Sequence, residues 1–380
     1  MSRSWAEIDL DAITDNVKTL RRSAPGAEVC AVVKADGYGH GVATVADAAI
    51  KAGATRLAVA QVAEGVALRN AGITAVDDVP IWVLSQPELH EFGAAAKARL
   101  EPAVYTSEAI DVAAEARRSH RSGQSPFTVH LKLDTGMHRV GAMPSDAIGL
   151  AGRVVAASGL RLGSVWTHMA CADDLSDRGV SITNSQLDAY DDALAKLAQA
   201  GIDVGLRHTA NSAALLAHPR SHFDVVRAGI ALYGLDPGSQ LGPRAGLRPV
   251  MSWKTTVGFV KQVKAGSALS YGHRMSVDQD CYVATLPVGY ADGFRRRLWA
   301  VGGQVLIGGV ARTIVGAVTM DQTIVDLGPD TTVQPGDEAV LIGTQGNEQL
   351  TADDMAQKLD TINYEITCSV GNRIERQPTP

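Results

Sequence analysis

The sequence has few cysteines, no long apolar run and no strong excess of either charge. Its four cysteines stand far apart, without the paired spacing of a disulfide framework or a zinc site; they are Cys30, Cys171, Cys281 and Cys368. No stretch approaches the roughly 18 uncharged apolar residues of a membrane span, and the first residues contain no apolar core like that of a signal peptide. We therefore expect a cytoplasmic protein that has no metal site and no membrane contact.

The charge balance narrows the possible partners further. The chain has 380 residues, a net charge of -6 and 46% hydrophobic residues. Mild acidity gives no electrostatic basis for binding nucleic acid or an anionic membrane, and the short basic run at 295–297 is typical of a solvated face. This length suits one large domain and a smaller one, each with enough apolar residues for a core.

The first 240 or so residues alternate short apolar runs with amphipathic segments of helical length. Between the runs, apolar residues recur at helical spacing, as in Leu187, Tyr190, Leu194 and Leu197. Strands that alternate with helices pair in parallel through crossover helices, and eight such units predict a closed (β/α)8 barrel. The eight predicted strands are Val29–Val33, Leu57–Ala60, Pro80–Leu84, Glu101–Val104, Phe127–Leu133, Arg161–Thr167, Gly205–His208 and Asp224–Arg227.

After about residue 242 the pattern changes to short β-rich runs separated by glycine and proline turns. One helix is predicted there, over Thr351–Leu359. We expect a barrel over residues 1–241 and a mostly antiparallel β domain over 242–380, with the first few residues pairing with the second domain. The predicted strands of the second domain are Val250–Thr256, Cys281–Pro287, Gln304–Ile307, Arg312–Val318, Thr323–Leu327 and Glu338–Ile342.

Polar residues end every predicted strand of the barrel. They are Lys34, Gln61, Ser85, Tyr105, Lys132 with Asp134, His168, His208 and Arg227. One polar strand end is ordinary solvation, but a full ring favours an active site, because barrel enzymes carry their chemistry at the C-terminal ends of the strands.

Two segments after the last strands suggest what this mouth binds. Ser212 follows Asn211 at the start of an alanine-rich helix, and Gly229 lets the backbone before Ile230 approach a ligand closely. A capping serine and a turn glycine would each be ordinary alone, but barrels often hold phosphate at these two loops. A lysine across the mouth, at position 34, then suggests a Schiff base with pyridoxal phosphate.

Nine stretches carry a resemblance to a known family over nearly the whole chain. They are AEIDLDAITDN, AVVKADGYGHG, LKLDTGMHRVG, WTHMACAD, RHTANSAA, VRAGIALYG, LSYGH, LPVGYADG and TMDQ. In this order and at these spacings the chain resembles alanine racemases. The resemblance implies an N-terminal (β/α)8 barrel, a C-terminal β domain and a head-to-tail homodimer with shared active sites. It also implies pyridoxal 5'-phosphate as cofactor and interconversion of L- and D-alanine for bacterial peptidoglycan.

The resemblance also implies roles for individual residues. Lys34 would hold the cofactor and act as one base, and Tyr271 of the partner subunit would act as the other. His168 would lie near that tyrosine, and Arg227 would bond to the pyridine nitrogen. The further cofactor-binding residues would be Tyr38, Asn211, Ser212, Gly229, Ile230 and Asn372. The further substrate-binding residues would be Arg139, Lys132 (carbamylated in many members), Tyr290, Met320 and Asp321.

Two positions depart from the family pattern. Asn372 stands where members usually carry a tyrosine, and Thr319 replaces a frequent cysteine. Members that act on serine have asparagine at the first position, so a serine or broader-specificity racemase is the alternative. A decarboxylase of the same fold would need an acidic partner for the ring nitrogen and a catalytic cysteine in the second domain. A non-catalytic pyridoxal-phosphate-binding protein would lack the second domain and its tyrosine.

Overall fold

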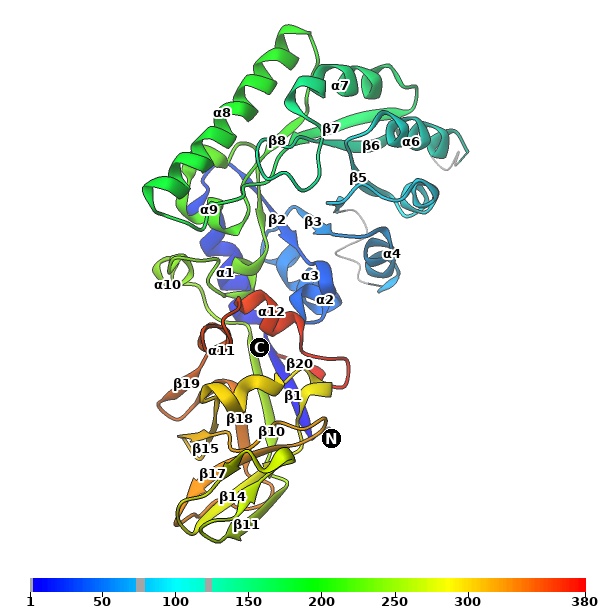
Figure 1. Ribbon diagram of the computed structural model, residues 1–380. Coiled ribbons are helices and arrows are strands. Elements are labelled where there is room, and N and C mark those ends of the chain that lie inside the picture. Colours follow the sequence, from blue (N-terminus) through cyan, green and yellow to red (C-terminus); the bar gives the residue numbers. More distant parts are fainter. Residues whose placement is uncertain (1–2, 73–78, 120–124) are drawn as a thin grey trace. The chain divides into compact units, whose positions relative to one another are not determined.

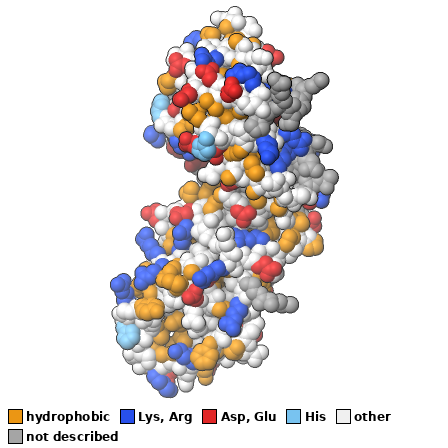
Figure 2. Space-filling model, turned by 90° about the vertical axis from the view of Figure 1, so that its right-hand side faces the viewer, with side chains coloured by type: hydrophobic (Ala, Val, Ile, Leu, Met, Phe, Trp, Pro, Cys, Tyr) orange, Lys and Arg blue, Asp and Glu red, His pale blue; other side chains and the backbone are white. Residues whose placement is uncertain are grey.

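A computed structural model of the protein describes residues 3–72, 79–119 and 125–380, which divide into two compact units (Figure 1). The first, here called the barrel unit, comprises Ala12–Gly37 and Val42–Arg248. The second, the β unit, comprises the residues up to Asp11, Tyr38–Gly41 and Pro249–Pro380. On the face shown in Figure 2, acidic and basic side chains are interspersed, as the small net charge leads one to expect.

Eight parallel strands form the centre of the barrel unit over the described residues, in the order β8-β7-β6-β5-β4-β3-β2-β9. All eight predicted strands are confirmed, each within one residue. They are β2 (Glu28–Val32), β3 (Arg56–Val59), β4 (Ile81–Val83), β5 (Leu100–Val104), β6 (Phe127–Lys132), β7 (Leu160–Trp166), β8 (Leu206–His208) and β9 (Val225–Ala228).

The strands come close to a closed circle. β9 pairs with β2. β8 meets β9 through single backbone bonds, in which Asp224 N–H donates to Arg207 O at 3.0 Å and Arg227 N–H donates to Ala210 O at 3.1 Å. The C-terminal strand ends are therefore arranged around one mouth, as predicted.

Helices precede, connect and follow these strands. They are α1 (Leu10–Ser23), α3 (Val42–Lys51), α4 (Val62–Asn70), α5 (Phe92–Lys97), α6 (Ser107–Ser119), α7 (Ala147–Ala156), α8 (Asp177–Gln199), α9 (Ser212–Ala217) and α10 (Leu241–Ala245). The predicted helical stripe lies on α8, where Leu187, Tyr190 and Leu197 are fully buried. Within the described segments, no helix is both long and apolar enough to cross a membrane.

The β unit contains mostly antiparallel sheets, as expected. The largest has the order β16-β15-β18-β10-β1-β20, with β19 added on β18; the others are β11-β14-β17 and β12-β13. β1 pairs antiparallel with β10 and parallel with β20. The strands are β1 (Ser4–Asp9), β10 (Met251–Thr256), β11 (Phe259–Val263), β12 (Ala268–Leu269), β13 (Met275–Ser276), β14 (Cys281–Leu286), β15 (Gln304–Ile307), β16 (Val310–Thr313), β17 (Thr323–Gly328), β18 (Glu338–Gln345), β19 (Glu348–Leu350) and β20 (Glu375–Thr379).

One predicted strand, Arg312–Val318, is wrong in position. The strand β16 ends at Thr313, and Ile314 makes only an isolated bridge to Val325. The chain turns at Gly316, whose φ of +70° is unsuitable for a strand and where an added Cβ would lie 2.8 Å from Ser270 Cβ. The helix α11 (Ala352–Leu359) agrees with the prediction, whereas α12 (Asn363–Cys368) was not predicted.

A glycine on β7 provides a test of the barrel packing. A Cβ at Gly163 would lie 2.4 Å from Thr128 Cγ2 and 2.8 Å from His130 Cε1, and both side chains are buried. We expect Gly163→Ala to lower the free energy of unfolding by about 1 to 3 kcal/mol through overpacking. The control is Gly149→Ala on α7, where an added Cβ meets no described atom within 4 Å. It should be neutral or stabilise by about 0.5 to 1 kcal/mol. Urea denaturation measures both, and equal midpoints would contradict the packing argument.

Candidate active site

The residues that follow Lys34 form a left-handed turn. This segment, α2 (Lys34–Tyr38), has φ values of 52° at Ala35, 52° at Asp36, 62° at Gly37 and 52° at Tyr38. A left-handed conformation costs roughly 1 to 2 kcal/mol for each residue other than glycine. Such strain persists only where surrounding contacts impose it, and it concentrates at functional sites. The turn therefore favours a chemical role for Lys34 over a simple solvated strand end.

Glu64 supplies one of the contacts that hold this turn and also binds the backbone after β3. Its carboxylate accepts from Ala35 N–H at 2.7 Å, and also from Ala60 N–H at 2.8 Å and Gln61 N–H at 3.1 Å. Glu64 lies in the first turn of α4, so one carboxylate ties the backbone after Lys34 to the end of β3. The sequence analysis did not identify this residue.

Arg227 is a buried cation with neutral acceptors around it. The residue is only 2% exposed, and its guanidinium donates to Thr167 O and Thr209 O at 2.9 Å each. It also donates to Nδ1 of His208 at 2.7 Å and to Nδ1 of His168 at 3.1 Å. Burial lowers the pKa of Arg227 to about 10, so the group remains charged at neutral pH. Because arginine can only donate, Nδ1 of His208 must be an unprotonated acceptor, whereas Thr167 O, Thr209 O and His168 Nδ1 share the two protons of Nη2.

Positive charge accumulates around His168. Burial lowers the pKa of its imidazole well below the usual value, and the charges of Arg227, Lys132, Arg139 and Lys34 lower it further. Burial, followed by Arg139 and Arg227, lowers the pKa of Lys132 to about 8. A mouth with several converging cations suits an anionic ligand, because a low-dielectric cleft focuses their field.

The loops after β8 and β9 meet at Ser212. Its Oγ accepts from Gly229 N–H at 2.9 Å and from Ala231 N–H at 3.2 Å. The hydroxyl proton can therefore be donated to a third group, such as a phosphate oxygen. Asn211 caps α9 by accepting from Ala214 N–H at 2.9 Å. The residues of this unit for which the sequence predicted roles lie at strand ends, on the loops that follow or at the first residue of the next helical segment; they are Lys34, Lys132, Arg139, His168, Asn211, Ser212, Arg227, Gly229 and Ile230.

The remaining predicted residues belong to the β unit, and several lie on adjoining segments. Tyr290 N–H donates to Thr319 O at 3.0 Å, next to Met320. Asp321 accepts from Arg373, the neighbour of the exposed Asn372, at 2.6 Å. The β unit thus holds Tyr290, Met320 and Asp321 close to residues 372–373.

Two predicted tyrosines of the β unit differ sharply in exposure. Tyr271 is 72% exposed, and its turn is anchored by Ser270 Oγ, which donates to Ala317 O at 2.6 Å. Tyr38 is buried, and its ring centroid lies 6.1 Å from that of Tyr364. Tyr271 therefore presents its phenol outward, whereas Tyr38 is packed within the unit.

The sequence analysis missed a buried polar chain inside the barrel. It consists of Glu101, His130, Ser164 and His208, and it ends at Arg227. A signal was available, since polar residues alternate along β6 at Thr128, His130 and Lys132, as expected of side chains that face one side of a strand.

Comparisons with known proteins show which family the chain is similar to over its length. Residues 8–237 match the family described as "Alanine racemase, N-terminal domain", and residues 250–378 match "Alanine racemase, C-terminal domain". An alanine racemase of Symbiobacterium thermophilum is 44% identical over 99% of this chain and 97% of its own length.

Solved structures show the same likeness. The alanine racemase of Streptomyces coelicolor has a TM-score of 0.92 and 40% identity, covering 99% of this chain and 98% of its own. That of Bacillus anthracis with bound L-Ala-P has a TM-score of 0.89 and 37% identity, covering 98% of this chain and 94% of its own. Since both family domains match in order and full-length relatives exceed 30% identity, the chain belongs to the alanine racemase family.

Proposed function

We propose that this enzyme interconverts L- and D-alanine by a two-base mechanism in which Lys34 and Tyr271 act on opposite faces of the substrate. The observation that carries the proposal is the cationic barrel mouth. The positive charges that lower the pKa of His168 there are those of Arg227, Lys132, Arg139 and Lys34. A phosphorylated cofactor and a carboxylate substrate are both anions that such a mouth would attract.

The described residues fit pyridoxal 5'-phosphate, the cofactor of the family. Lys34 would bind it covalently, and the Ser212 hydroxyl would donate to its phosphate together with the backbone at Gly229 and Ile230. Asn211, Tyr38 and Asn372 would complete the phosphate end. When bound, the cofactor withdraws electrons from the carbon that loses its proton.

Arg227 would face the ring nitrogen of the cofactor. A guanidinium gives up no proton at neutral pH, so the nitrogen stays unprotonated and electron withdrawal is moderate. A short-lived negative charge at the substrate carbon favours return of a proton over side reactions such as transamination. A carboxylate in this place, as expected of a decarboxylase, would have the opposite effect.

Racemisation needs one proton removed on one face and one returned on the other. Lys34 would act on the first face and Tyr271 on the second, with His168 beside the tyrosine. We further propose a homodimer in which the β domain, residues 242–380, completes the site of the barrel domain, residues 1–241, in the partner. The 72% exposure of Tyr271 supports this arrangement, because an exposed phenol is available to a second chain.

Substrate binding would involve both units. Arg139 would bind the carboxylate, and Tyr290, Met320 and Asp321 of the partner would line the entrance. Lys132, with a pKa of about 8, is roughly a tenth neutral at pH 7. A neutral amine can add to carbon dioxide with loss of a proton, and the resulting carbamate would place a negative charge beside Arg139. The free thiols of Cys30, Cys171 and Cys281 support a reducing, cytoplasmic setting, in which the enzyme would supply D-alanine for peptidoglycan.

Replacement of Lys34 tests the cofactor attachment. Lys34→Ala should lose the near-visible absorption band of the bound cofactor and nearly all racemisation, because no amine remains to form the covalent bond. Lys51→Ala is the control, since Lys51 is a surface residue on α3 whose Nζ pairs with Asp47. Borohydride reduction that attached the cofactor to another lysine would disprove the assignment.

Subunit mixing tests the shared site. Tyr271→Phe should retain the cofactor but lose racemisation in both directions, because the second face has no base. Mixed with Lys34→Ala subunits, it should regain activity, since one hybrid site then has both groups. A lack of recovery, with subunit exchange shown by mass spectrometry, would contradict a Tyr271 that acts across the interface.

Asn372 tests substrate range and the serine alternative. A short amide leaves more room than the phenol usual at this position, and it can bond to a substrate hydroxyl. One satisfied hydroxyl contributes about 0.5 to 1.5 kcal/mol, or roughly up to tenfold in relative rate. We expect Asn372→Tyr to lower the ratio of kcat/KM for L-serine to that for L-alanine. An unchanged ratio would show that Asn372 does not determine specificity.

A further inference from the structure

A continuous chain of hydrogen bonds crosses the interior of the barrel, with one residue from each of five successive strands. Arg227 on β9 bonds to Nδ1 of His208 on β8 at 2.7 Å, and Nε2 of His208 bonds to Ser164 Oγ on β7 at 2.9 Å. Ser164 Oγ also bonds to Nδ1 of His130 on β6 at 2.7 Å, and Nε2 of His130 bonds to Glu101 on β5 at 3.1 Å. Glu101 thus lies at the opposite end of the chain from Arg227.

The two ends determine the direction of every bond. Arginine can only donate, so His208 accepts at Nδ1, carries its proton on Nε2 and donates to Ser164. The Ser164 hydroxyl then donates to Nδ1 of His130, which carries its proton on Nε2. That proton is donated to the carboxylate of Glu101, which can only accept. If His130 were charged, both His130 and His208 would donate to Ser164 Oγ. The hydroxyl proton of Ser164 would then need another acceptor in this buried site.

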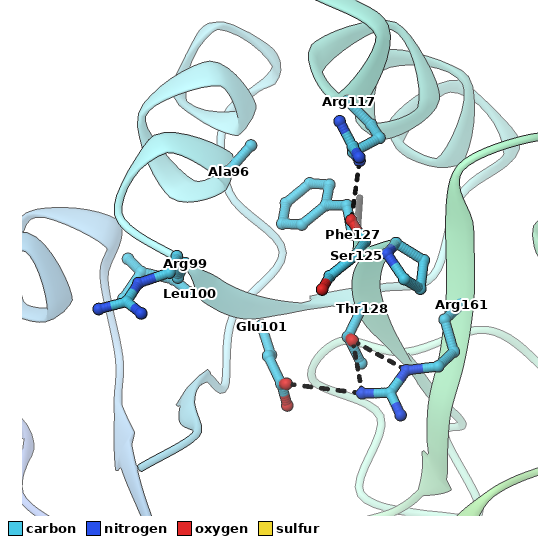
Figure 3. A pocket seen from close by; sticks show the side chains of 10 residues that line it. Ala96, Arg99, Leu100, Glu101, Arg117, Ser125, Phe127, Thr128 and Arg161 are labelled. Carbon is cyan, nitrogen blue, oxygen red and sulfur yellow. Dashed lines mark hydrogen bonds and ion pairs between the residues drawn. The ribbon is translucent and has the colours of Figure 1, made fainter. Parts of the chain in front are cut away.

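The outer end is maintained as an anion. Burial would raise the pKa of Glu101, but other causes outweigh it and lower the pKa below its usual value. They are the hydrogen bond from His130 and its charge when protonated, the hydrogen bond from Trp82 and the charge of Arg161. Trp82 Nε1 donates to Glu101 at 3.0 Å, and Arg161 lies 3.9 Å from it. Glu101 and Arg161 line a cavity of about 530 Å³ at the N-terminal ends of β5 and β6 (Figure 3).

Aromatic rings hold the inner imidazole in place. His208 stacks between Trp82, at 4.5 Å between centroids, and Trp166, at 5.4 Å. The ring is 1% exposed and cannot exchange its partners with water. The hydrogen bonds to Arg227 and Ser164 therefore set the orientation and the proton position of the His208 imidazole.

We propose that Glu101, His130 and Ser164 are positioning residues for the racemase reaction, which act through His208 to hold Arg227 in the donor geometry that the cofactor nitrogen requires. The negative charge of Glu101 stabilises the Arg227 cation through these hydrogen bonds, because each donor in a hydrogen-bonded series polarises the next. Without the bond to Ser164, His208 could carry its proton on Nδ1 instead. The Nδ1–H would then face an N–H of Arg227, and the hydrogen bond between them would be lost.

The first test needs no cofactor. In cofactor-free protein labelled with ¹⁵N-histidine, we expect His208 to be neutral with its proton on Nε2, and Ser164→Ala to populate the Nδ1–H form. Ser221→Ala is the matched control, because Ser221 is also fully buried and its hydroxyl proton is shared between His218 O and Ala214 O. It should leave the His208 signals unchanged. Wild-type His208 protonated on Nδ1, or equal spectra for the two variants, would overturn the proposal.

Kinetics separate positioning from general stability. Loss of the chain should lower kcat about tenfold with little change in KM, and raise the fraction of turnovers lost to transamination, whereas Ser221→Ala should stay within about twofold. Glu101→Gln keeps the shape but lets an amide donate to His130, so it should change both the tautomer and kcat without unfolding the barrel. Equal losses in Ser164→Ala and Ser221→Ala would contradict the proposal.

The inference rests on the proposed role of Arg227, and the two tests fail separately. If Arg227→Lys racemised alanine normally, the proposed contact with the cofactor would be wrong, whatever the tautomer of His208. If Ser164→Ala left the His208 tautomer unchanged while Arg227→Lys lost activity, only the proposed role of the hydrogen-bond chain would be disproved.

Discussion

The interior of the barrel unit depends on one buried positive charge. Arg227 is 2% exposed, so the protein itself must replace the water that would surround a guanidinium. Two backbone carbonyls and two imidazoles do so, all of them neutral. Burial, and then the charge of Arg227, lowers the pKa values of His168 and His208 well below the usual range. The need for polar partners also explains why polar residues stand inside β6 and β7 and at the end of β8.

A second constraint acts on the backbone. The left-handed turn after Lys34 is unfavourable for three of its four residues and is held from outside, partly by the carboxylate of Glu64. A strained segment on a rigid barrel gives a lysine a defined position with little freedom, which a nucleophile requires. The charge at Arg227 and the strain at Lys34 thus come from two paired strands, β9 and β2, and serve the same mouth.

Much of the barrel was predictable because its signals are local. Apolar runs bounded by turns located all eight strands within one residue, including β5, whose second residue is the charged Glu101. The error at Arg312–Val318 has a non-local cause, since the turn at Gly316 packs against Ser270, 46 positions earlier in the chain. Glu64 was missed for the same reason, because its partner Ala35 lies 29 residues away.

The sequence alone determined the alternation of strands and helices, the polar strand ends and the family to which the chain belongs, because each depends on residue type and spacing. It could not determine which atoms meet. His130, Ser164 and His208 come from three strands, and their hydrogen bonds exist only because strand pairing sets His130 opposite Ser164 and Trp166 opposite His208. The proton positions in that chain of hydrogen bonds were decided by tertiary structure, because burial leaves each polar atom only the partners that the fold supplies.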